Sequence, residues 1–168
     1  MGQNKMDKGF IIFTDIFMQK TKKSPTKISK LAKAWRALAK DKKNYEKAMN
    51  FYEAFLNAQF WIKLDDSEEE NFGKYKKRGI KANEKIDVSL SKTGSILLFE
   101  ARKELEKEVA KNYKKGEKIT IATIRQHGGE IIYSFGKKTT YAIKIKEVRD
   151  FVYIYPENVT FIKKNFHQ

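Results

Sequence analysis

The side chains that most often do chemistry in proteins are sparse in this chain of 168 residues. Its two histidines are His127 and His167, and neither has a second histidine or a cysteine at metal-ligand spacing. Because His127 precedes Gly128-Gly129, we interpret it as a solvated turn residue rather than a ligand or a catalytic base. The sequence has no Gly-rich phosphate loop and no Gly-x-Ser-x-Gly motif. We therefore expect no catalytic residue, no metal site and no cofactor.

Two groups of acidic residues are the remaining candidates for cation chemistry. Residues 65–70 lack the loop glycine and the spaced ligands of a calcium site, which favours a solvated tract. The densest acids of the second half alternate with lysines, as on the solvated face of a helix: Glu100, Glu104, Glu106 and Glu108. A nuclease that acts through these carboxylates stays open as an alternative, and a cleavage assay with divalent cations would detect it.

Positive charge is the strongest signal in the composition. Lys and Arg number 36 against 21 Asp and Glu, which gives a formal net charge of +15. A positive field attracts polyanions, and each neutralised phosphate releases counterions. Residues 1–64 hold 14 basic and 5 acidic side chains, so the charge is denser there than in the rest of the chain. We predict a nucleic-acid partner, with duplex DNA as the leading case. The alternatives are an acidic membrane surface, an acidic protein, and a coding bias toward lysine without any partner.

The composition also bears on fold and compartment. Hydrophobic residues make up 40% of the chain and aromatic residues 13%, which is enough for a packed core. The absence of cysteine excludes disulfides and thiolate metal sites. Apolar runs are only a few residues long, and the N-terminus lacks a signal-peptide pattern. We expect an intracellular protein without a membrane partner, in a nucleus or nucleoid rather than free in the cytoplasm.

The elements that must position the basic residues change character near residue 65. Before it, apolar residues recur at helical spacing and predict helices over residues 10–17, 24–38 and 41–60. Trp61, Ile62 and Leu64 either extend the third helix or begin a linker that packs on the second half. An acidic block followed by a basic block, flanked by glycines, then predicts a charged linker over residues 65–84.

After residue 85 the apolar residues recur mostly at strand spacing. We predict a strand over 86–90, a helix over 99–113, and then strands over 118–124, 130–135, 140–146, 151–155 and 159–162, with Gly128-Gly129 as a turn. The predicted fold class is therefore α+β. A three-helix module (1–64) and the linker (65–84) precede a small antiparallel sheet domain with one helix (85–168).

The helical half resembles the HMG box over about residues 6 to 60. That family has an aromatic-rich first helix, a second helix with a central tryptophan, and a third helix that opens on an aromatic. The matching stretches are residues 10–13, residues 28–38 with the spacing Leu31, Trp35, Leu38, and residues 41–48 with Tyr45. Other three-helix DNA-binding folds, including homeodomain-like ones, give the same apolar pattern. We interpret Phe13, Phe17, Trp35 and Tyr45 as helical core.

The resemblance implies a mechanism. An L-shaped helical domain lies on the minor groove and inserts an apolar wedge between base steps. The position that matches the wedge is Ile11, for which a core role is the alternative. Candidate phosphate contacts are Lys8, Lys20, Lys22, Lys23, Lys30, Lys33 and Arg36. The basic run 74–78 adds Lys76, Lys77 and Arg78, or serves as a nuclear address. The implied function is that of a non-catalytic architectural or accessory DNA-binding protein, which bends duplex DNA if the wedge is present.

The second half is similar to the strand–helix–strand unit of bacterial swapped-hairpin transition-state regulators, which are DNA-binding dimers. Residues 88–98, the helix with Arg102 and Leu105, and residues 115–119 carry this similarity, and a generic α+β domain is the alternative. A second function also stays open, that of a structural or adaptor subunit in a nucleoprotein or virion assembly. Aromatic residues of this half are the predicted interface of such a subunit: Tyr133, Phe135, Tyr141, Phe151, Tyr153 and Tyr155. The alternative is that residues which alternate along a strand, such as Tyr133 and Phe135, share one inward face.

Overall fold

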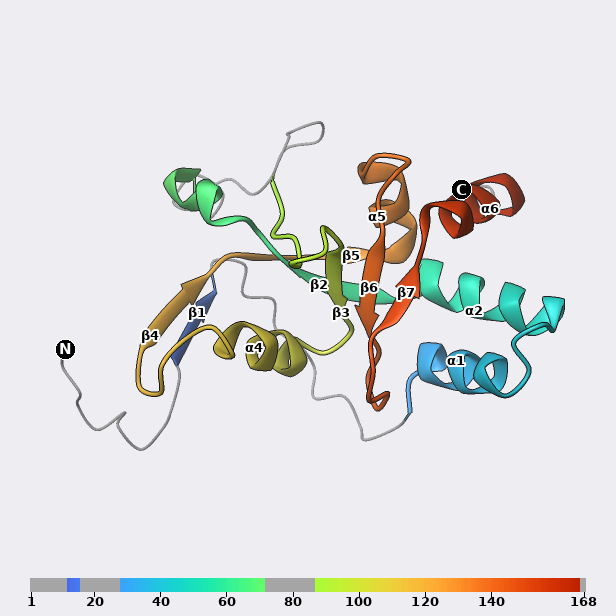
Figure 1. The fold of residues 1–168 in the computed structure, drawn as a ribbon, viewed down its shortest axis with the longest axis horizontal. Helices are drawn as coiled ribbons and strands as arrows, with labels where there is room; N and C mark the ends of the chain where they lie inside the picture. The colour runs from blue at the N-terminus through green and yellow to red at the C-terminus, as the bar shows by residue number, and fades with distance from the viewer. Residues whose placement is uncertain (1–11, 16–27, 72–86, 167–168) are drawn as a thin grey trace.

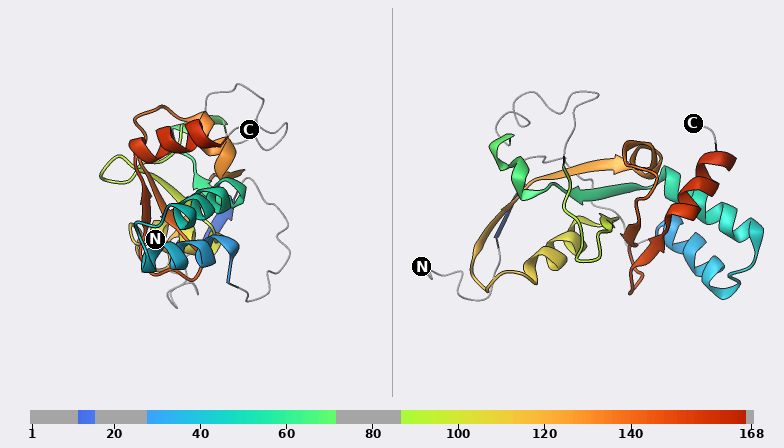
Figure 2. Two further views of the ribbon diagram at one scale, coloured as in Figure 1. Left: turned by 90° about the vertical axis from the view of Figure 1, so that its right-hand side faces the viewer. Right: turned by 45° about the horizontal axis from the view of Figure 1, so that its top comes forward.

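The computed structural model describes residues 12–15, 28–71 and 87–166 (Figure 1). These residues form a mixed α+β fold with five α-helices and a five-stranded sheet, which confirms the predicted fold class at this level. The helices are α1 (Lys30–Lys40), α2 (Tyr45–Asn57), α4 (Arg102–Ala110), α5 (Gly128–Ser134) and α6 (Pro156–Asn165). Figure 1 and the right-hand view of Figure 2 show α1 and α2 at one end of the molecule and α4 toward the other.

The sheet has the strand order β5-β2-β3-β6-β7. Its strands are β2 (Gln59–Lys63), β3 (Ile96–Phe99), β5 (Thr123–His127), β6 (Tyr141–Lys144) and β7 (Val152–Ile154). The β3–β6 pair is parallel, so the prediction of an antiparallel sheet is wrong at its centre. A parallel pair needs a long crossover connection, and the chain between β3 and β6, which contains α4 and α5, provides one. A second parallel pair joins β1 (Ile12–Asp15) to β4 (Lys118–Ile121).

Two of the three helices predicted in the first half are present, as α1 and α2. The helix predicted over residues 10–17 is wrong for Ile12–Asp15, which form β1. Stiff β-branched residues such as Ile12 and Thr14 suit a strand, and β4 supplies the backbone partner. The third predicted helix ends at Asn57, and β2 follows it directly. Ser29 and Asn44 are the N-caps of α1 and α2, because the side chain of each accepts a backbone N–H.

The predicted linker begins with the short 3-10 helix η2 (Asp66–Asn71), and residues 72–84 lie outside the described part of the chain. Glu68 in this helix is only 6% exposed. Its Oε2 accepts a hydrogen bond of 2.8 Å from the backbone N–H of Asp87. The interpretation of residues 65–70 as a solvated tract is therefore wrong at Glu68, which fastens η2 to the segment that leads into β3.

Within residues 87–166 the structure has three α-helices, not the one predicted. Residues 130–135 belong mainly to α5 and residues 159–162 to α6, where strands were predicted. Pro156 is the first residue of α6, and the N–H of Tyr155 bonds Asn158 Oδ1 at 2.9 Å, so local start signals explain this helix. The predicted strand over 86–90 is reduced, within residues 87–90, to isolated bridges at Val88 and Leu90.

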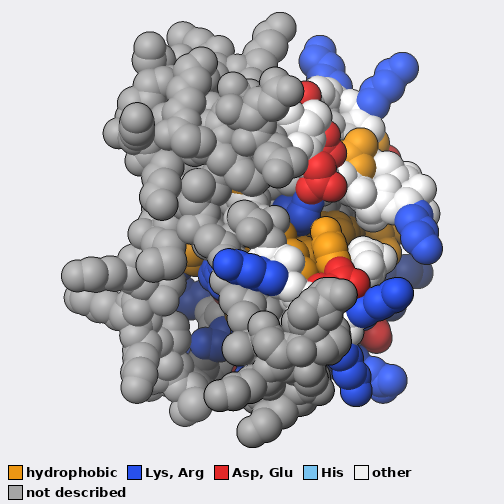
Figure 3. All heavy atoms as spheres, turned by 90° about the vertical axis from the view of Figure 1, so that its left-hand side faces the viewer, with side chains coloured by type: hydrophobic (Ala, Val, Ile, Leu, Met, Phe, Trp, Pro, Cys, Tyr) orange, Lys and Arg blue, Asp and Glu red, His pale blue; other side chains and the backbone are white. Residues whose placement is uncertain are grey.

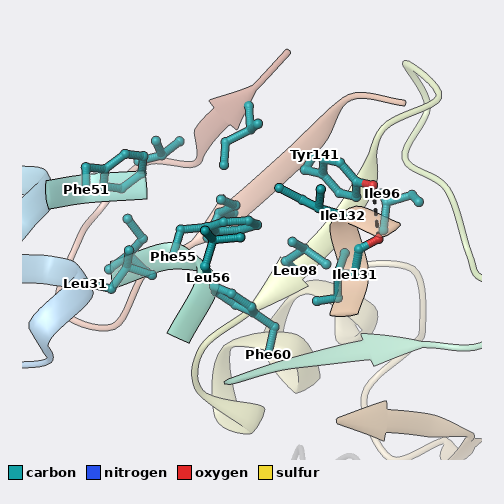
Figure 4. Close-up of a cluster of buried hydrophobic side chains, with 14 of the residues drawn as sticks. Leu31, Phe51, Phe55, Leu56, Phe60, Ile96, Leu98, Ile131, Ile132 and Tyr141 are labelled. Atoms are coloured by element: carbon teal, nitrogen blue, oxygen red, sulfur yellow. Dashed lines mark hydrogen bonds between the residues drawn. The ribbon is translucent and has the colours of Figure 1, made fainter. Parts of the chain in front are cut away.

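Both faces of the sheet carry a hydrophobic core. On one face, alternate strand residues such as Phe60 and Tyr141 meet the inward sides of α1, α2, α5 and α6 (Figure 4). On the other face, Trp61 and Phe99 pack with Leu105 of α4 and with β4. The strand β2 belongs to the predicted segment 1–64, whereas its neighbours β3 and β5 belong to the predicted segment 85–168. The two helices of the first half therefore pack on a sheet built from both sides of that boundary.

The phenol of Tyr141 lies in the larger core, and burial raises its pKa above the ordinary value of 10.0. As pH rises above 10.0, the unfolded chain releases this proton while the folded chain keeps it. The free energy of unfolding should therefore fall by up to about 1.4 kcal/mol per pH unit from this group. We expect Tyr141→Phe to remove the part of this decrease in the free energy of unfolding that Tyr141 causes. Urea unfolding at neutral and alkaline pH measures it. Equal alkaline slopes for both proteins would contradict the burial of an ionisable group here.

Candidate nucleic-acid interface

The outer side of α1 carries only basic and small side chains. Leu31, Trp35 and Leu38 face the core, as the helical spacing predicted, and Ala32 lies there with them. Exposed basic side chains follow one another on the opposite side at i, i+3 and i+7, with Lys30 at the flank: Lys33, Arg36 and Lys40. The eleven residues of α1 include no Asp or Glu. We call Lys30, Lys33, Arg36 and Lys40 the α1 basic face.

Hydrogen bonds from the N-cap and from Arg36 join α1 to the sheet and to one of its turns. Ser29, the N-cap, donates from Oγ to Glu100 Oε1 at 2.9 Å, just beyond the end of β3. The same carboxylate oxygen accepts the backbone N–H of Lys146 at 2.8 Å. Arg36 Nη2 donates at 2.7 Å to the backbone oxygen of Glu147, in the turn between β6 and β7. These bonds connect α1 to the end of β3 and to the turn between β6 and β7, which defines where its basic side chains begin.

The turn that receives Arg36 has an unusual backbone. Glu147 has a φ of 67°, in the left-handed region that residues other than glycine seldom adopt. The hydrogen bond from Arg36 to its carbonyl oxygen helps to hold that conformation. Arg36 thus has a structural partner in addition to its exposed position, which the prediction of a phosphate contact did not include.

Three of the predicted nucleic-acid contacts are brought together on the α1 basic face: Lys30, Lys33 and Arg36. The other predicted contacts lie outside the described residues: Lys8, Ile11, Lys20, Lys22, Lys23, Lys76, Lys77 and Arg78. Sequence reasoning missed Lys40, although it follows Arg36 by four residues and was therefore on the same helical side. The wedge role of Ile11 required a helix that continues through residues 12–15, and these residues form β1 instead.

A hollow of about 490 Å³ lies between α1 and α2, beside Lys30. Two carboxylates, Glu53 and Glu100, line it. Because like charges repel, these carboxylates oppose the entry of an anion. The phosphate-binding potential of α1 therefore belongs to its basic face and not to this hollow.

The aromatic residues predicted as an interface separate into two groups. Tyr141 is fully buried, and Phe135 packs partly buried against the core. The side chains of Tyr133, Tyr153 and Tyr155 are about half exposed. Tyr153 and Tyr155 lie on the same side of the chain with their ring planes 15° apart and their centroids 6.0 Å apart. Tyr45, which we predicted to be core, is 63% exposed.

The other candidate chemical groups have local partners. Three glutamates of α4 form local ion pairs, as the solvated-face interpretation predicted: Glu104 with Lys107, Glu106 with Arg102, and Glu108 with Lys111 at the C-cap. That interpretation is wrong for Glu100, which precedes α4 and accepts hydrogen bonds from Ser29 and Lys146. His127 precedes α5 and its Nδ1 lies 3.3 Å from Glu130 Oε1. Among residues 12–15, 28–71 and 87–166, no three His, Asp or Glu side chains are grouped as a metal site.

Two further observations concern partners. None of the helices in the described part of the chain is both long and apolar enough to cross a membrane. We also compared the chain with protein-family models, with curated proteins and with solved structures, and none of the three comparisons found a match.

Proposed function

We propose that this chain is a non-catalytic DNA-binding protein, of an architectural or accessory kind, that holds duplex DNA by its phosphate backbone. The α1 basic face is the observation that carries the proposal. Lys33 and Lys40 are seven residues apart, a rise of about 10 Å along the helix. One strand of B-DNA advances about 3.4 Å along the helix axis for each phosphate, so three long basic side chains spread over this rise can each reach a different phosphate.

The chemistry of the face suits backbone binding without sequence reading. Lysine and arginine donate to phosphate oxygens, and such contacts position a protein on DNA but carry little base information. The acid-free surface of α1 lowers the repulsion that a polyanion meets. The net charge of +15 adds a long-range attraction that speeds encounter. Bending is not part of the proposal, because the wedge has no described helix to carry it.

We expect duplex binding to weaken steeply as salt rises. If Lys33, Arg36 and Lys40 neutralise three phosphates, the plot of log Kobs against log salt should have a slope of about −2.7 or steeper. Fluorescence anisotropy with a labelled duplex at several salt concentrations measures this slope. An affinity for duplex DNA that is unchanged by added salt would contradict the proposal.

An adaptor role in a larger nucleoprotein or virion assembly is the second candidate. It is favoured by β7, which ends the sheet and presents the half-exposed rings of Tyr153 and Tyr155. This candidate expects the purified chain to bind no duplex DNA and to copurify with a fixed partner. The salt titration separates the two functions, because only the first predicts a measurable affinity for naked duplex.

A further inference from the structure

A groove of about 960 Å³ lies on the sheet face opposite α1 and α2. Its floor is the outer side of β3, β6 and β7, where Leu97, Ala142 and Tyr153 stand in one row across the three strands. Because the side chain of Ala142 is small, it leaves space at the centre of this row, and Phe99 and Phe151 also line the groove. The floor is therefore apolar and partly aromatic, and its volume is near the upper end of the range for small-molecule pockets.

Two elements wall the groove. On one side, Leu105 and Val109 of α4 line the groove and pack with the cluster beneath it, and Tyr113, just after that helix, also lines the groove. On the other side, residues 89–93 form a turn that Ser91 fastens, since its Oγ accepts the N–H of Ser95 at 3.0 Å. Lys92 is exposed in this turn. Figure 3, which views the molecule from the end where α4 and β4 lie, shows hydrophobic side chains exposed between basic and acidic ones.

The rim of the groove is basic on balance. Lys63, Lys92 and Lys111 line it together with two acids, Asp66 and Glu108. Lys63 Nζ lies 3.1 Å from Asp66 Oδ1, and Lys111 Nζ lies 3.0 Å from Glu108 Oε1. Both acidic side chains are thus neutralised by ion pairs, and the charge of Lys92 is left in excess. An anionic group meets net attraction at this rim.

We infer that the groove takes a short single-stranded segment of nucleic acid, with unpaired bases on its floor and a backbone phosphate at Lys92. The bases of a duplex are stacked inside the helix, so only unpaired bases can reach an apolar floor. Aromatic side chains beside a basic rim are the usual means of binding single strands without sequence preference. The inference rests on the proposed function, since it assigns a second nucleic-acid surface to the same protein.

Tyr153 is the side chain that this inference makes most important. Tyr153 is 47% exposed, and stacking with the ring of Tyr155 at 15° helps to hold the plane of its own ring in one orientation. A peptide could also place apolar side chains on the floor. The basic rim, on a chain with a net charge of +15, favours the polyanion. Binding of a polypeptide in the groove in place of a single strand would therefore contradict the inference.

We expect Tyr153→Ala to weaken binding of a labelled short oligothymidylate about ten-fold or more, at about 0.1 M salt. Its affinity for a duplex should stay unchanged. Tyr153→Phe keeps the ring and should bind the oligothymidylate as the parent chain does. Lys92→Gln should lower the salt slope for the oligothymidylate by about 0.7, the value for one phosphate contact on a single strand. Anisotropy titrations measure all of these affinities.

Tyr133→Ala is the matched control, because Tyr133 is 51% exposed on α5, outside the groove. Thermal melting of each variant confirms that the fold is retained. If Tyr153→Ala leaves the oligothymidylate affinity unchanged while duplex binding persists, the inference is overturned and the proposed function stands. Crosslinking of a peptide, but not of oligothymidylate, to Tyr153 would likewise overturn it. If the parent chain binds neither nucleic acid, the proposed function itself fails.

Discussion

Gly128→Ala is expected to destabilise the folded chain by about 3 kcal/mol or more, because the added methyl group has no space. A Cβ at this position would lie 2.1 Å from the backbone oxygen of Phe55 and 2.8 Å from its carbonyl carbon. Both atoms belong to the main chain of α2, so no side-chain rotation relieves the clash. The first turn of α5 would have to move away from α2. The loss is a large part of the 5–15 kcal/mol that typically stabilises a domain.

Gly136→Ala is the matched control for this experiment. A Cβ at Gly136 would meet no atom within 4 Å, and its φ is not positive. We expect this variant to change stability by no more than about 0.5 kcal/mol. Urea unfolding of both variants, followed by far-UV circular dichroism, gives the comparison. Equal unfolding midpoints for the two variants would show that α5 does not pack on the backbone of α2 as described.

Gly128 also shows why part of the fold could not be predicted. A Gly-Gly pair before a short apolar run has the appearance of a hairpin turn, and we predicted a turn and a strand. The structure uses Gly128 for a different property of glycine, the close approach of two backbones. Its N–H donates to the backbone oxygen of Ala58 at 2.9 Å, a residue seventy positions earlier. The residues next to Gly128 in the sequence do not predict that Ala58 lies beside it.

The helices α1 and α2 could be predicted because their periodicity is long and regular. Leu31, Trp35 and Leu38 all face the core, as their spacing predicted, and the structure shows Lys33 and Arg36 exposed on the outer side. Strand β2 could not be predicted in the same way. Only Ala58 separates its residues from α2, and pairing with β5, sixty or more residues later, makes them a strand. Tertiary contacts override local propensity in such a segment.

The two candidate sites differ in the same respect, because one depends on local sequence and the other on strand pairing. The α1 basic face lies within one helix, and three of its four members were among the phosphate contacts that the HMG-box resemblance implied. The groove needs Leu97, Ala142 and Tyr153 from three strands to stand side by side. That arrangement depends on the parallel pairing of β3 with β6, which the predicted antiparallel order did not contain. A site made by strand order becomes visible only after the topology is known.

Reversal of charge on α1 should reduce duplex affinity on the order of a hundred-fold at about 0.1 M salt. The variant is Lys33→Glu/Lys40→Glu, which leaves Arg36 and its hydrogen bond to Glu147 in place. Two phosphate contacts are lost, and the new carboxylates repel the backbone. The salt slope should become shallower by about 1.8. Because both lysines are exposed, stability should change by no more than about 1 kcal/mol, mostly from Glu at the C-terminal end of the helix.

Lys137→Glu/Lys138→Glu makes the same change in net charge at an exposed turn between α5 and β6. Comparison of the two double variants distinguishes a loss of direct contacts on α1 from a general effect of net charge. Long-range attraction depends on the total charge, so it falls equally in both double variants. Direct phosphate contacts are lost only where the DNA lies. A much larger loss for the α1 pair therefore places the duplex on that helix. Equal losses would mean that net charge alone draws the DNA, and the α1 basic face would then have no special role.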